Sequence, residues 1–207
     1  MLGTHTCKGT RFRVNWSVIS PKTYHHPDLR KALIDEGLNQ IERVGMDLSL
    51  RAIAKSIGVS PTAPYRHFAD RRALMGALAA EGFHHFTDAL SVANTEPSPM
   101  AAVKKLGFAY LGFARKQPLL YKLMFSPYGH SLNSDSCKEA ADRAFGALIS
   151  CVARANEAGW KRGHAVLTLS LSYWAELHGW ACLSSDRLLP PEVTEATWDE
   201  LLDAYFA

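Results

Sequence analysis

The stretch that most constrains this chain is residues 49–68, where two short helical patterns meet across a tight turn. In its first half, apolar residues recur at i, i+3, i+4 and i+7, which is one face of a helix. Ser49 stands at the N-cap position, and Gly58 follows the last apolar residue, where a left-handed backbone commonly ends a helix. Ser60 and Pro61 then have the residue types of an N-cap and a first helical position. The stretch is therefore predicted to be a helix-turn-helix.

The predicted second helix has two unlike faces, at about 100° per residue. Pro61, Pro64 and Phe68 fall on one side, with Tyr65 at its edge. The opposite side is small at its N-terminal end and cationic or hydrogen-bonding further on, and it comprises Thr62, Ala63, Arg66 and His67. Such a helix fits the major groove of DNA, with its N-terminal residues near base edges. Pro64 removes one backbone hydrogen bond, which we expect to have little effect so near the N-terminus.

The same stretch resembles the N-terminal domain of the TetR family of transcriptional regulators. The resemblance is carried by the runs Leu50-Arg51-Ala52-Ile53-Ala54, Gly58-Val59-Ser60, Ala63-Pro64-Tyr65-Arg66-His67-Phe68 and Ala73-Leu74. The Tyr-x-His-Phe ending is its most specific part. The resemblance implies an all-α fold, in which a three-helix DNA-binding domain precedes a helical-bundle domain for ligand binding and dimerisation.

The resemblance also implies which side chains would touch DNA. Residues 61–63 would lie against bases, while Ser49, Tyr65 and His67 would hold phosphates. Arg71 stands where the family usually has a Lys near the start of the next helix. In full, the candidate DNA-contacting set is Ser49, Arg51, Ser60, Pro61, Thr62, Ala63, Tyr65, Arg66, His67 and Arg71.

Basic residues concentrate in the same part of the chain. Residues 1–75 contain 12 Lys and Arg against 6 Asp and Glu, whereas residues 76–207 contain 11 against 14. A basic region that coincides with a helix-turn-helix is the electrostatic footprint of a nucleic-acid partner. Residues 1–24 carry four of these cations and no acidic residue. We interpret them as a disordered extension, with a basic arm that contacts phosphates as the alternative.

Helical patterns and helix-breaking residues divide the rest of the chain. We predict the DNA-binding domain over residues 25–86 and the ligand-binding and dimerisation domain over residues 87–207. Asp70 and Ser98 have the positions of N-caps. The predicted helices cover about 27–44, 71–92, 99–116, 118–125, 135–158, 164–185 and 191–206. The helix over 71–92 is expected to link the two domains mechanically.

Aromatic and sulfur-containing side chains gather on the predicted C-terminal helices. Such side chains usually build a core, but in a domain that also holds a ligand they line its apolar pocket. Trp174 and His178 lie one turn apart, and the Trp-x-x-x-His-Gly pattern resembles a C-terminal domain found in part of the TetR family. No charged cluster marks this region, so we expect an apolar or weakly polar effector. The pocket candidates are Phe108, Tyr110, Phe113, Tyr121, Met124, Phe125, Trp174 and His178.

Small residues follow one stripe of the helix over 164–185, which permits close approach of another helix. The last helix is strongly apolar and calls for a partner. In the TetR family, the last two long helices form a four-helix bundle with their copies in a second subunit. The dimer-interface candidates are Ala175, Gly179, Cys182, Trp198 and Leu202. A homodimer of this kind would read double-stranded DNA as a near-palindromic operator.

The function that these observations favour is a DNA-binding transcriptional regulator, most simply a dimeric repressor that a small apolar ligand releases. A regulator whose ligand promotes DNA binding remains the alternative. An all-helical enzyme that uses His178 with Glu176 or Cys182 is a much weaker hypothesis, because no motif brings an acid, a base and a nucleophile together. A helix-turn-helix used only for protein interaction is opposed by the basic N-terminal half.

Several classes of site and location are disfavoured by the sequence. His84 and Asp88 are four residues apart, but no third metal ligand is placed, so we expect no metal and no cofactor. Four cysteines without C-x-x-C spacing suit idle thiols in a reducing cytoplasm. We expect no membrane span and no export signal, because neither pattern occurs.

Overall fold

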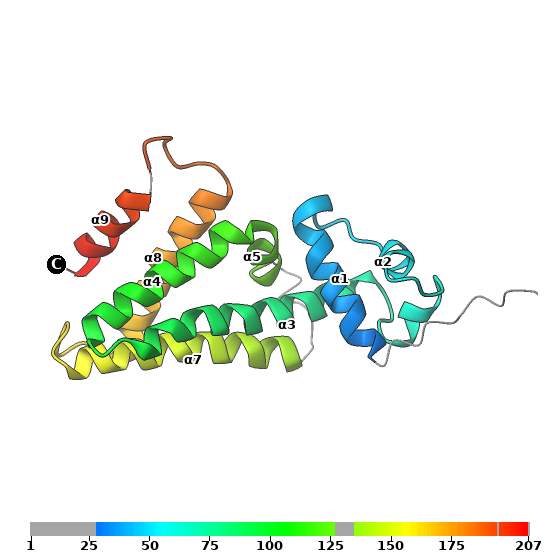
Figure 1. The fold of residues 1–207 in the computed structure, drawn as a ribbon. Helices are drawn as coiled ribbons and strands as arrows, with labels where there is room; N and C mark the ends of the chain where they lie inside the picture. The colour runs from blue at the N-terminus through cyan, green and yellow to red at the C-terminus, as the bar shows by residue number, and fades with distance from the viewer. Residues whose placement is uncertain (1–27, 127–134, 194, 207) are drawn as a thin grey trace, which may run out of the picture.

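The computed structural model describes residues 28–126, 135–193 and 195–206, and every regular element in those ranges is a helix (Figure 1). The prediction of an all-α fold is confirmed. In chain order the elements are α1 (Leu29–Val44), α2 (Leu50–Ser56), η1 (Ala63–Arg66), α3 (Arg71–Leu90), η2 (Ser91–Thr95), α4 (Pro99–Lys116), α5 (Pro118–Met124), α7 (Asp135–Glu157), α8 (Val166–Ser185) and α9 (Glu195–Phe206). The basic extension over residues 1–24 lies outside the described residues. Among the described helices, none combines the length and the apolar character that crossing a bilayer requires.

An N-cap and one carboxylate organise α1 and α2. Asp28 caps α1, because its Oδ1 accepts the backbone N–H of Lys31 at 2.9 Å. The predicted opening residue, Pro27, lies outside the described residues. Glu36 on α1 accepts a hydrogen bond from the hydroxyl of Ser56 on α2 at 2.6 Å. This bond stabilises the charged form of Glu36 and lowers its pKa, so the carboxylate ties the two helices together.

The turn after α2 ends the helix in the way the sequence predicts. Gly58 has φ +75°, in the left-handed region that favours glycine. Its N–H donates to the carbonyl of Lys55 at 3.2 Å, and the N–H of Val59 donates to the carbonyl of Ala54 at 2.9 Å. These two bonds form a Schellman motif, which satisfies the last carbonyls of α2 and turns the chain sharply.

The second half of the motif is a 3₁₀ helix, η1, rather than the α-helix expected to start at Pro61 after an N-cap at Ser60. Its backbone bonds span three residues, as when the N–H of Ala63 donates to the carbonyl of Ser60 at 3.0 Å. Pro64 has no N–H, so the α-helical bond from residue 64 to the carbonyl of Ser60 cannot form. Pro61 removes no such bond, because the first helical position has no intrahelical acceptor. The bonds that η1 does form have the tighter 3₁₀ pattern. The expectation that Pro64 has little effect stays a prediction.

The long helix α3 joins the helix-turn-helix to the rest of the molecule. In Figure 1 it starts beside α1 and runs into the bundle alongside α7. Asp70 caps it as predicted, accepting the N–H of Ala73 at 2.8 Å. A Cβ atom at Gly37 of α1 would lie only 2.8 Å from Cδ2 of Leu78, so glycine lets α1 and α3 approach closely there.

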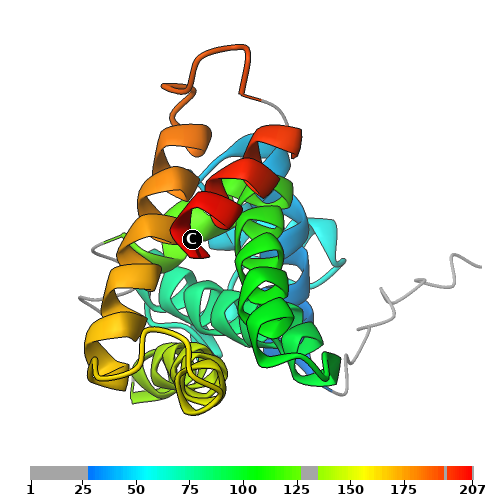
Figure 2. The ribbon, with the colours of Figure 1, turned by 90° about the vertical axis from the view of Figure 1, so that its left-hand side faces the viewer.

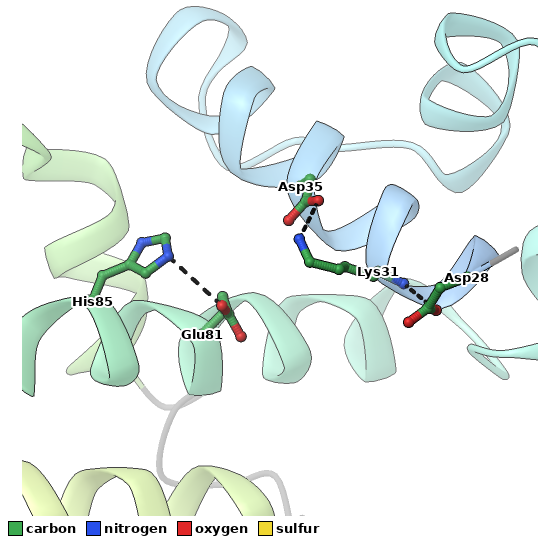
Figure 3. A network of polar contacts seen from close by, with 5 residues as sticks. All are labelled: Asp28, Lys31, Asp35, Glu81 and His85. Carbon is green, nitrogen blue, oxygen red and sulfur yellow. Dashed lines mark hydrogen bonds and ion pairs between the residues drawn. The ribbon is translucent and has the colours of Figure 1, made fainter. Parts of the chain in front are cut away.

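The edge of the α1–α3 interface is polar and open to solvent. Figure 3 shows Lys31 of α1, whose backbone N–H donates to Asp28 and whose Nζ pairs with Asp35 at 2.6 Å. The neighbouring stretch of α3 carries Glu81, which lies 3.6 Å from Nε2 of His85. Exposed pairs of this kind contribute little stability. The two helices are therefore held together chiefly by their buried faces.

Helices α4, α5 and α7 pack against α3, while α8 packs against α4 and α7, and α9 packs against α4. Ser98 caps α4 as predicted, with Pro99 at the first helical position and the N–H of Ala101 donating to Ser98 Oγ at 3.4 Å. In Figure 2, α4 and α8 stand on opposite sides, with α7 seen end-on below and α9 across the top. Tyr173 of α8 is fully buried, and its hydroxyl donates to the carbonyl of Val103 on α4 at 2.9 Å.

Two helices start later than the sequence suggests. α8 starts at Val166 rather than near residue 164, because Gly163 has φ +91° and turns the chain just before it. α9 starts at Glu195 rather than near Pro191. There the N–H of Val193 donates to the carbonyl of Pro190 at 3.0 Å, which closes a single turn.

Candidate nucleic-acid interface and ligand cavity

The helix-turn-helix presents most of the predicted contact residues to solvent. Thr62, Arg66 and His67 are exposed, and Tyr65 is 47 % exposed. The inward face is confirmed at Pro64 and Phe68, which are both buried. Pro61 is exposed, contrary to the predicted inward face, because η1 does not begin until residue 63. A long aromatic side chain and two basic or hydrogen-bonding ones therefore project from one surface.

An open hollow of about 640 Å³ lies between α2 and η1. Four of the predicted residues line it, namely Arg51, Pro61, Thr62 and Tyr65. Lys55 also lines the hollow but was not among the candidates. The signal was present in the sequence, because Lys55 follows Arg51 by four residues and so shares its exposed helical face. Two cations beside a concave surface suit a phosphate backbone.

The two serines of the motif behave differently. Ser49 is exposed and caps α2, with its Oγ 3.5 Å from the backbone N of Ala52. Its hydroxyl hydrogen is therefore directed away from the helix and is available to an acceptor such as a phosphate. Ser60 forms no cap, and its Oγ instead lies 3.0 Å from Oγ1 of Thr62. This contact fixes two hydroxyls at the start of η1.

Arg71, one of the candidate DNA contacts, is hydrogen-bonded within the domain. Its Nε donates to the carbonyl of Leu48 at 3.0 Å, and a second nitrogen donates to the carbonyl of Met46. The same guanidinium lies 3.7 Å from Asp47. The Arg71 side chain thus fixes the loop between α1 and α2 against the N-terminus of α3. Ser49 follows Leu48 directly in this loop, so the same contacts help to position Ser49.

A cavity of about 200 Å³ lies between α3, α4, α7, α8 and the end of α5. Its described lining is strongly aromatic and consists of Phe83, Phe86, Leu90, Tyr110, Phe125, Ala141, Asp142, Ala144, Phe145, Leu148, Leu171 and Trp174. Three of the predicted pocket residues, Tyr110, Phe125 and Trp174, line it directly. Asp142 is the charged side chain of this lining, and it is exposed at the edge.

Three polar side chains from three helices form a hydrogen-bonded chain beside the cavity. The hydroxyl of Tyr110 lies 2.9 Å from the hydroxyl of Tyr121, which lies 2.6 Å from Nδ1 of His178. The chain is satisfied when the Tyr110 hydroxyl donates to Tyr121, the Tyr121 hydroxyl donates onward and Nδ1 accepts the last proton. Nε2 then carries hydrogen and faces Sγ of Cys182 at 3.5 Å.

This chain of groups is uncharged at neutral pH. Burial raises the pKa of the Tyr110 and Tyr121 hydroxyls, so both stay protonated. Burial lowers the pKa of His178, which favours its neutral form. The Trp-x-x-x-His spacing thus places an indole and a neutral imidazole one helical turn apart, against the same tyrosine pair.

Three of the predicted pocket residues lie elsewhere. Phe108 borders a different hollow, of about 310 Å³, between α4, α8 and α9. Met124 is fully buried and packs against Gly82 of α3. Phe113 is buried against Phe86, with ring centroids 5.1 Å apart. Phe108 and Phe113 lie on α4, which contributes Tyr110 to the cavity, and Met124 lies on α5, which Phe125 ends. The sequence therefore predicts the helices that border the cavity but not the face of each helix that does so.

The most central aromatic residue of the cavity was missed. Phe86 of α3 is buried and packs against Tyr110, Phe113, Tyr121 and Phe125, with centroid distances of 4.8 to 6.5 Å. The sequence predicts that α3 links the two domains, and its aromatic residues are not among the pocket candidates. The apolar pattern does not show which face of α3 borders the cavity, because α3 is apolar on nearly every side.

The dimer-interface candidates have mixed environments. Ala175 is exposed, and open space adjoins Gly179, so both offer surface to another molecule. Trp198 packs edge-on against Trp180 at 5.7 Å between ring centroids. Leu202 is buried and lies against Gly107, so it is a core residue of this chain. Cys182, as described, lies against His178.

Of the groups weighed for an enzyme, Cys182 lies 3.5 Å from Nε2 of His178 through its Sγ. Burial, followed by the nearby Asp186 charge, raises the pKa of Cys182, so its sulfur stays a thiol rather than a reactive thiolate. Burial raises the pKa of Glu176. His84 lies 3.4 Å from the guanidinium of Arg143. Within the described residues, His, Cys, Asp and Glu form no group of three or more that could hold a metal.

Two family models match the chain. The model described as bacterial regulatory proteins of the tetR family matches residues 33–78. The model described as the tetracyclin repressor-like C-terminal domain matches residues 103–205. The first match covers the helix-turn-helix with parts of α1 and α3, and the second covers most of the helices that enclose the cavity.

Solved structures and curated proteins are also similar to the chain. A protein of unknown function from Rhodococcus sp. RHA1 is 31 % identical, with a TM-score of 0.79 over 89 % of this chain and 97 % of that one. The TetR family regulator PfmR from Thermus thermophilus is 18 % identical, with a TM-score of 0.61 over 84 % and 94 %. The uncharacterized HTH-type transcriptional regulator YobS of Bacillus subtilis is 28 % identical over 45 % of this chain and 49 % of its own. A second uncharacterized HTH-type regulator, from Haemophilus influenzae, is 46 % identical over 20 % of this chain and 21 % of its own. The chain thus spans about half of one curated relative and a fifth of the other.

Proposed function

The chain belongs to the TetR family of bacterial regulatory proteins, and we propose that it is a dimeric transcriptional repressor whose DNA affinity a small ligand controls. One observation carries this proposal. A basic, exposed helix-turn-helix and an aromatic cavity are connected by a single long helix, α3. Such an arrangement joins a DNA-reading surface to a site that can respond to a ligand.

The DNA contacts divide into positioning and reading. Arg51, Lys55 and Tyr65 border the hollow and suit phosphate contacts, which supply most of the affinity and make it fall with added salt. Thr62 and Ala63 stand at the start of η1, where side chains would reach base edges. Two copies related by a two-fold axis would then read a near-palindromic operator.

The effector that best fits the cavity is small, uncharged and largely apolar. The described lining offers phenyl, indole and aliphatic surface, and its hydrogen-bonded chain is neutral. Asp142 at the edge disfavours anions. AibR, which shares this fold at 14 % identity, was solved with isovaleryl coenzyme A and operator DNA. A phosphate-bearing ligand of that kind lacks a cationic partner in the lining described here.

Ligand control is a matter of differential affinity. To carry the protein from nearly all DNA-bound to nearly all released, an effector must favour the released state by about 5.5 kcal/mol. The same cavity could serve a regulator whose ligand promotes DNA binding, because only the preferred state differs.

Operator binding tests the assignment directly. Duplexes selected from a random-sequence pool by the wild-type protein should bind with an affinity that falls steeply with salt. Tyr65→Ala should weaken binding to every duplex by about tenfold, because an exposed phosphate contact is lost. Thr62→Ala should instead change sequence preference, by roughly 1–3 kcal/mol at one base pair.

The matched control for Tyr65→Ala is Leu188→Ala, which removes a side chain that is 68 % exposed in the C-terminal half. This control should bind like the wild type. If Tyr65→Ala also bound like the wild type, or if no duplex were selected at any salt concentration, the assignment of the helix-turn-helix as the DNA-reading surface would be wrong.

A further inference from the structure

A carboxylate of α1 caps a helix of the other domain. Oε1 of Glu42 accepts the backbone N–H of Leu119 at 3.0 Å and that of Leu120 at 2.8 Å, and Oε2 lies 3.4 Å from the N of Leu119. Both amides belong to the first turn of α5, and Glu42 is half-buried. Gln117, which precedes α5, makes no side-chain cap. The cap is therefore supplied by a residue 77 positions away in sequence.

The capped helix also carries part of the cavity's polar chain. Tyr121 lies one residue beyond the two capped amides and bonds to His178. Phe125, which ends α5, lines the cavity directly. A ligand that contacts Phe125 in the cavity therefore touches the end of the same short helix whose first turn Glu42 caps.

The short helix has little freedom to move independently. A Cβ atom at Gly82 of α3 would lie 2.9 Å from Sδ of Met124 and 3.0 Å from Cδ1 of Leu120, so α5 packs tightly on α3. A seven-residue helix is not stable alone, so its position depends on these contacts and on its cap. Charged hydrogen bonds at a helix N-terminus are among the stronger ones, because the carboxylate also meets the positive end of the helix.

We propose that Glu42 is the positioning residue that couples the cavity to the helix-turn-helix. The proposal rests on the proposed function of the chain as a DNA-binding regulator. When a ligand displaces Tyr121 or Phe125, α5 moves, and its capped amides draw Glu42 and α1 with them. α1 is joined in turn to α2 through Glu36 and Ser56, so the movement reaches the DNA-reading surface.

The coupling must act in both directions, because linkage between two binding sites is reciprocal. Operator DNA should therefore change the stability of the first turn of α5 even when the cavity is empty. That consequence allows a test without a known effector. It also separates the Glu42 route from the continuous helix α3, which would transmit a change without the cap.

The experiment is site-resolved amide hydrogen exchange of Leu119 and Leu120 in the full chain, with and without a duplex selected by the wild-type protein. The variant is Glu42→Gln, which keeps the side-chain shape but removes the charge. The control is Asp35→Asn on the same helix, because Asp35 pairs only with Lys31 among the contacts drawn in Figure 3 and is half-exposed. Thermal unfolding of all three proteins checks that they are folded.

In the wild type and in Asp35→Asn, we expect operator DNA to change exchange at both amides by about tenfold, the effect of one weakened charged bond. In Glu42→Gln, exchange without DNA should be faster, and the DNA-dependent change should be lost while operator binding persists. A DNA-dependent change that survived in Glu42→Gln would assign the coupling to α3 and overturn the proposal. The absence of any change in the wild type would overturn it as well.

The two proposals fail in different ways. If no duplex binds the wild type, the proposed function is wrong and the coupling falls with it. If duplexes bind tightly and selectively but the α5 amides do not respond, the regulator assignment stands and the role of Glu42 is wrong.

Discussion

The helix-turn-helix and the aromatic cavity are specified in opposite ways. The helix-turn-helix is built from local signals, since Ser49, Gly58 and the two prolines each act on backbone within about five residues. The cavity is built from side chains of five helices, and its central hydrogen bond joins Tyr121 to His178 across 57 residues of sequence. A change in the first region acts through the backbone, whereas a change in the second acts through packing.

This difference decides how each region responds to mutation. Exposed side chains on the helix-turn-helix can change without disturbing the fold, because few atoms of the protein depend on them. Cavity side chains are shared between helices, so their loss affects stability and ligand binding together.

The largest expected effect is that of Phe86→Ala. Its ring is 3 % exposed and contacts four other aromatic rings, so its removal should lower the free energy of unfolding by about 3–5 kcal/mol. Denaturant unfolding would measure this loss. Tyr65→Ala removes another large aromatic side chain, but from an exposed position, and should leave the free energy of unfolding within about 0.5 kcal/mol of wild type.

Equal losses of unfolding free energy in Phe86→Ala and Tyr65→Ala would contradict this difference between the two regions. They would mean that the helix-turn-helix is as dependent on side-chain packing as the cavity is. A loss below about 1 kcal/mol for Phe86→Ala, with the fold retained, would show instead that the cavity collapses to fill the space.

The sequence predicts the first region well and the second only in outline, for the same reason. Caps at Ser49, Asp70 and Ser98 and the left-handed Gly58 depend on neighbouring residues, so pattern reading finds them. The 3₁₀ form of η1 is not predicted from the sequence, and it extends only over Ala63–Arg66.

In the cavity, composition identified the right helices, and the Trp-x-x-x-His pattern identified one wall. Neither composition nor this pattern predicts the rotation of α4, because that angle is set by packing against other helices. The rotation buries Tyr110 beside the cavity and turns Phe108 away from the cavity. The cap from Glu42 to α5 has no local signature at all. Its two partners come together only in the folded chain.

A smaller effect tests whether local backbone signals specify the helix-turn-helix. Gly58→Ala should lower the free energy of unfolding by about 1–2 kcal/mol, since the residue must hold φ +75° and a Cβ atom is costly there. No heavy atom lies within 4 Å of the added Cβ, so the cost is conformational rather than steric.

Gly146→Ala is the matched control for that variant. Its Cβ atom also meets open space, but Gly146 lies within α7, where alanine is preferred. This variant should raise the free energy of unfolding by roughly 0.5–1 kcal/mol. If both variants destabilised the protein equally, the Schellman turn would not be what Gly58 is needed for.

The smallest effect is a difference in how the two regions respond to acid. Burial lowers the pKa of His178 below its ordinary 6.5, so the unfolded chain binds this proton more readily than the folded one. The contribution of neutral His178 is fully present above about pH 6.5 and is lost as pH falls toward the lower folded pKa. Glu36 of α1 has its pKa lowered from 4.5 by its bond to Ser56, so its contribution is lost only below that pH.

The cavity should therefore weaken at a milder acidity than the contact between α1 and α2. Glu176, whose pKa burial raises, acts in the opposite sense, so the useful quantity is the difference in unfolding free energy between wild type and His178→Gln across about pH 4–8. That difference should shrink as pH falls below about 6.5. A difference that stayed constant over this range would mean that His178 is as free to take up a proton in the folded chain as in the unfolded one. The tyrosine chain would then not depend on its neutral imidazole.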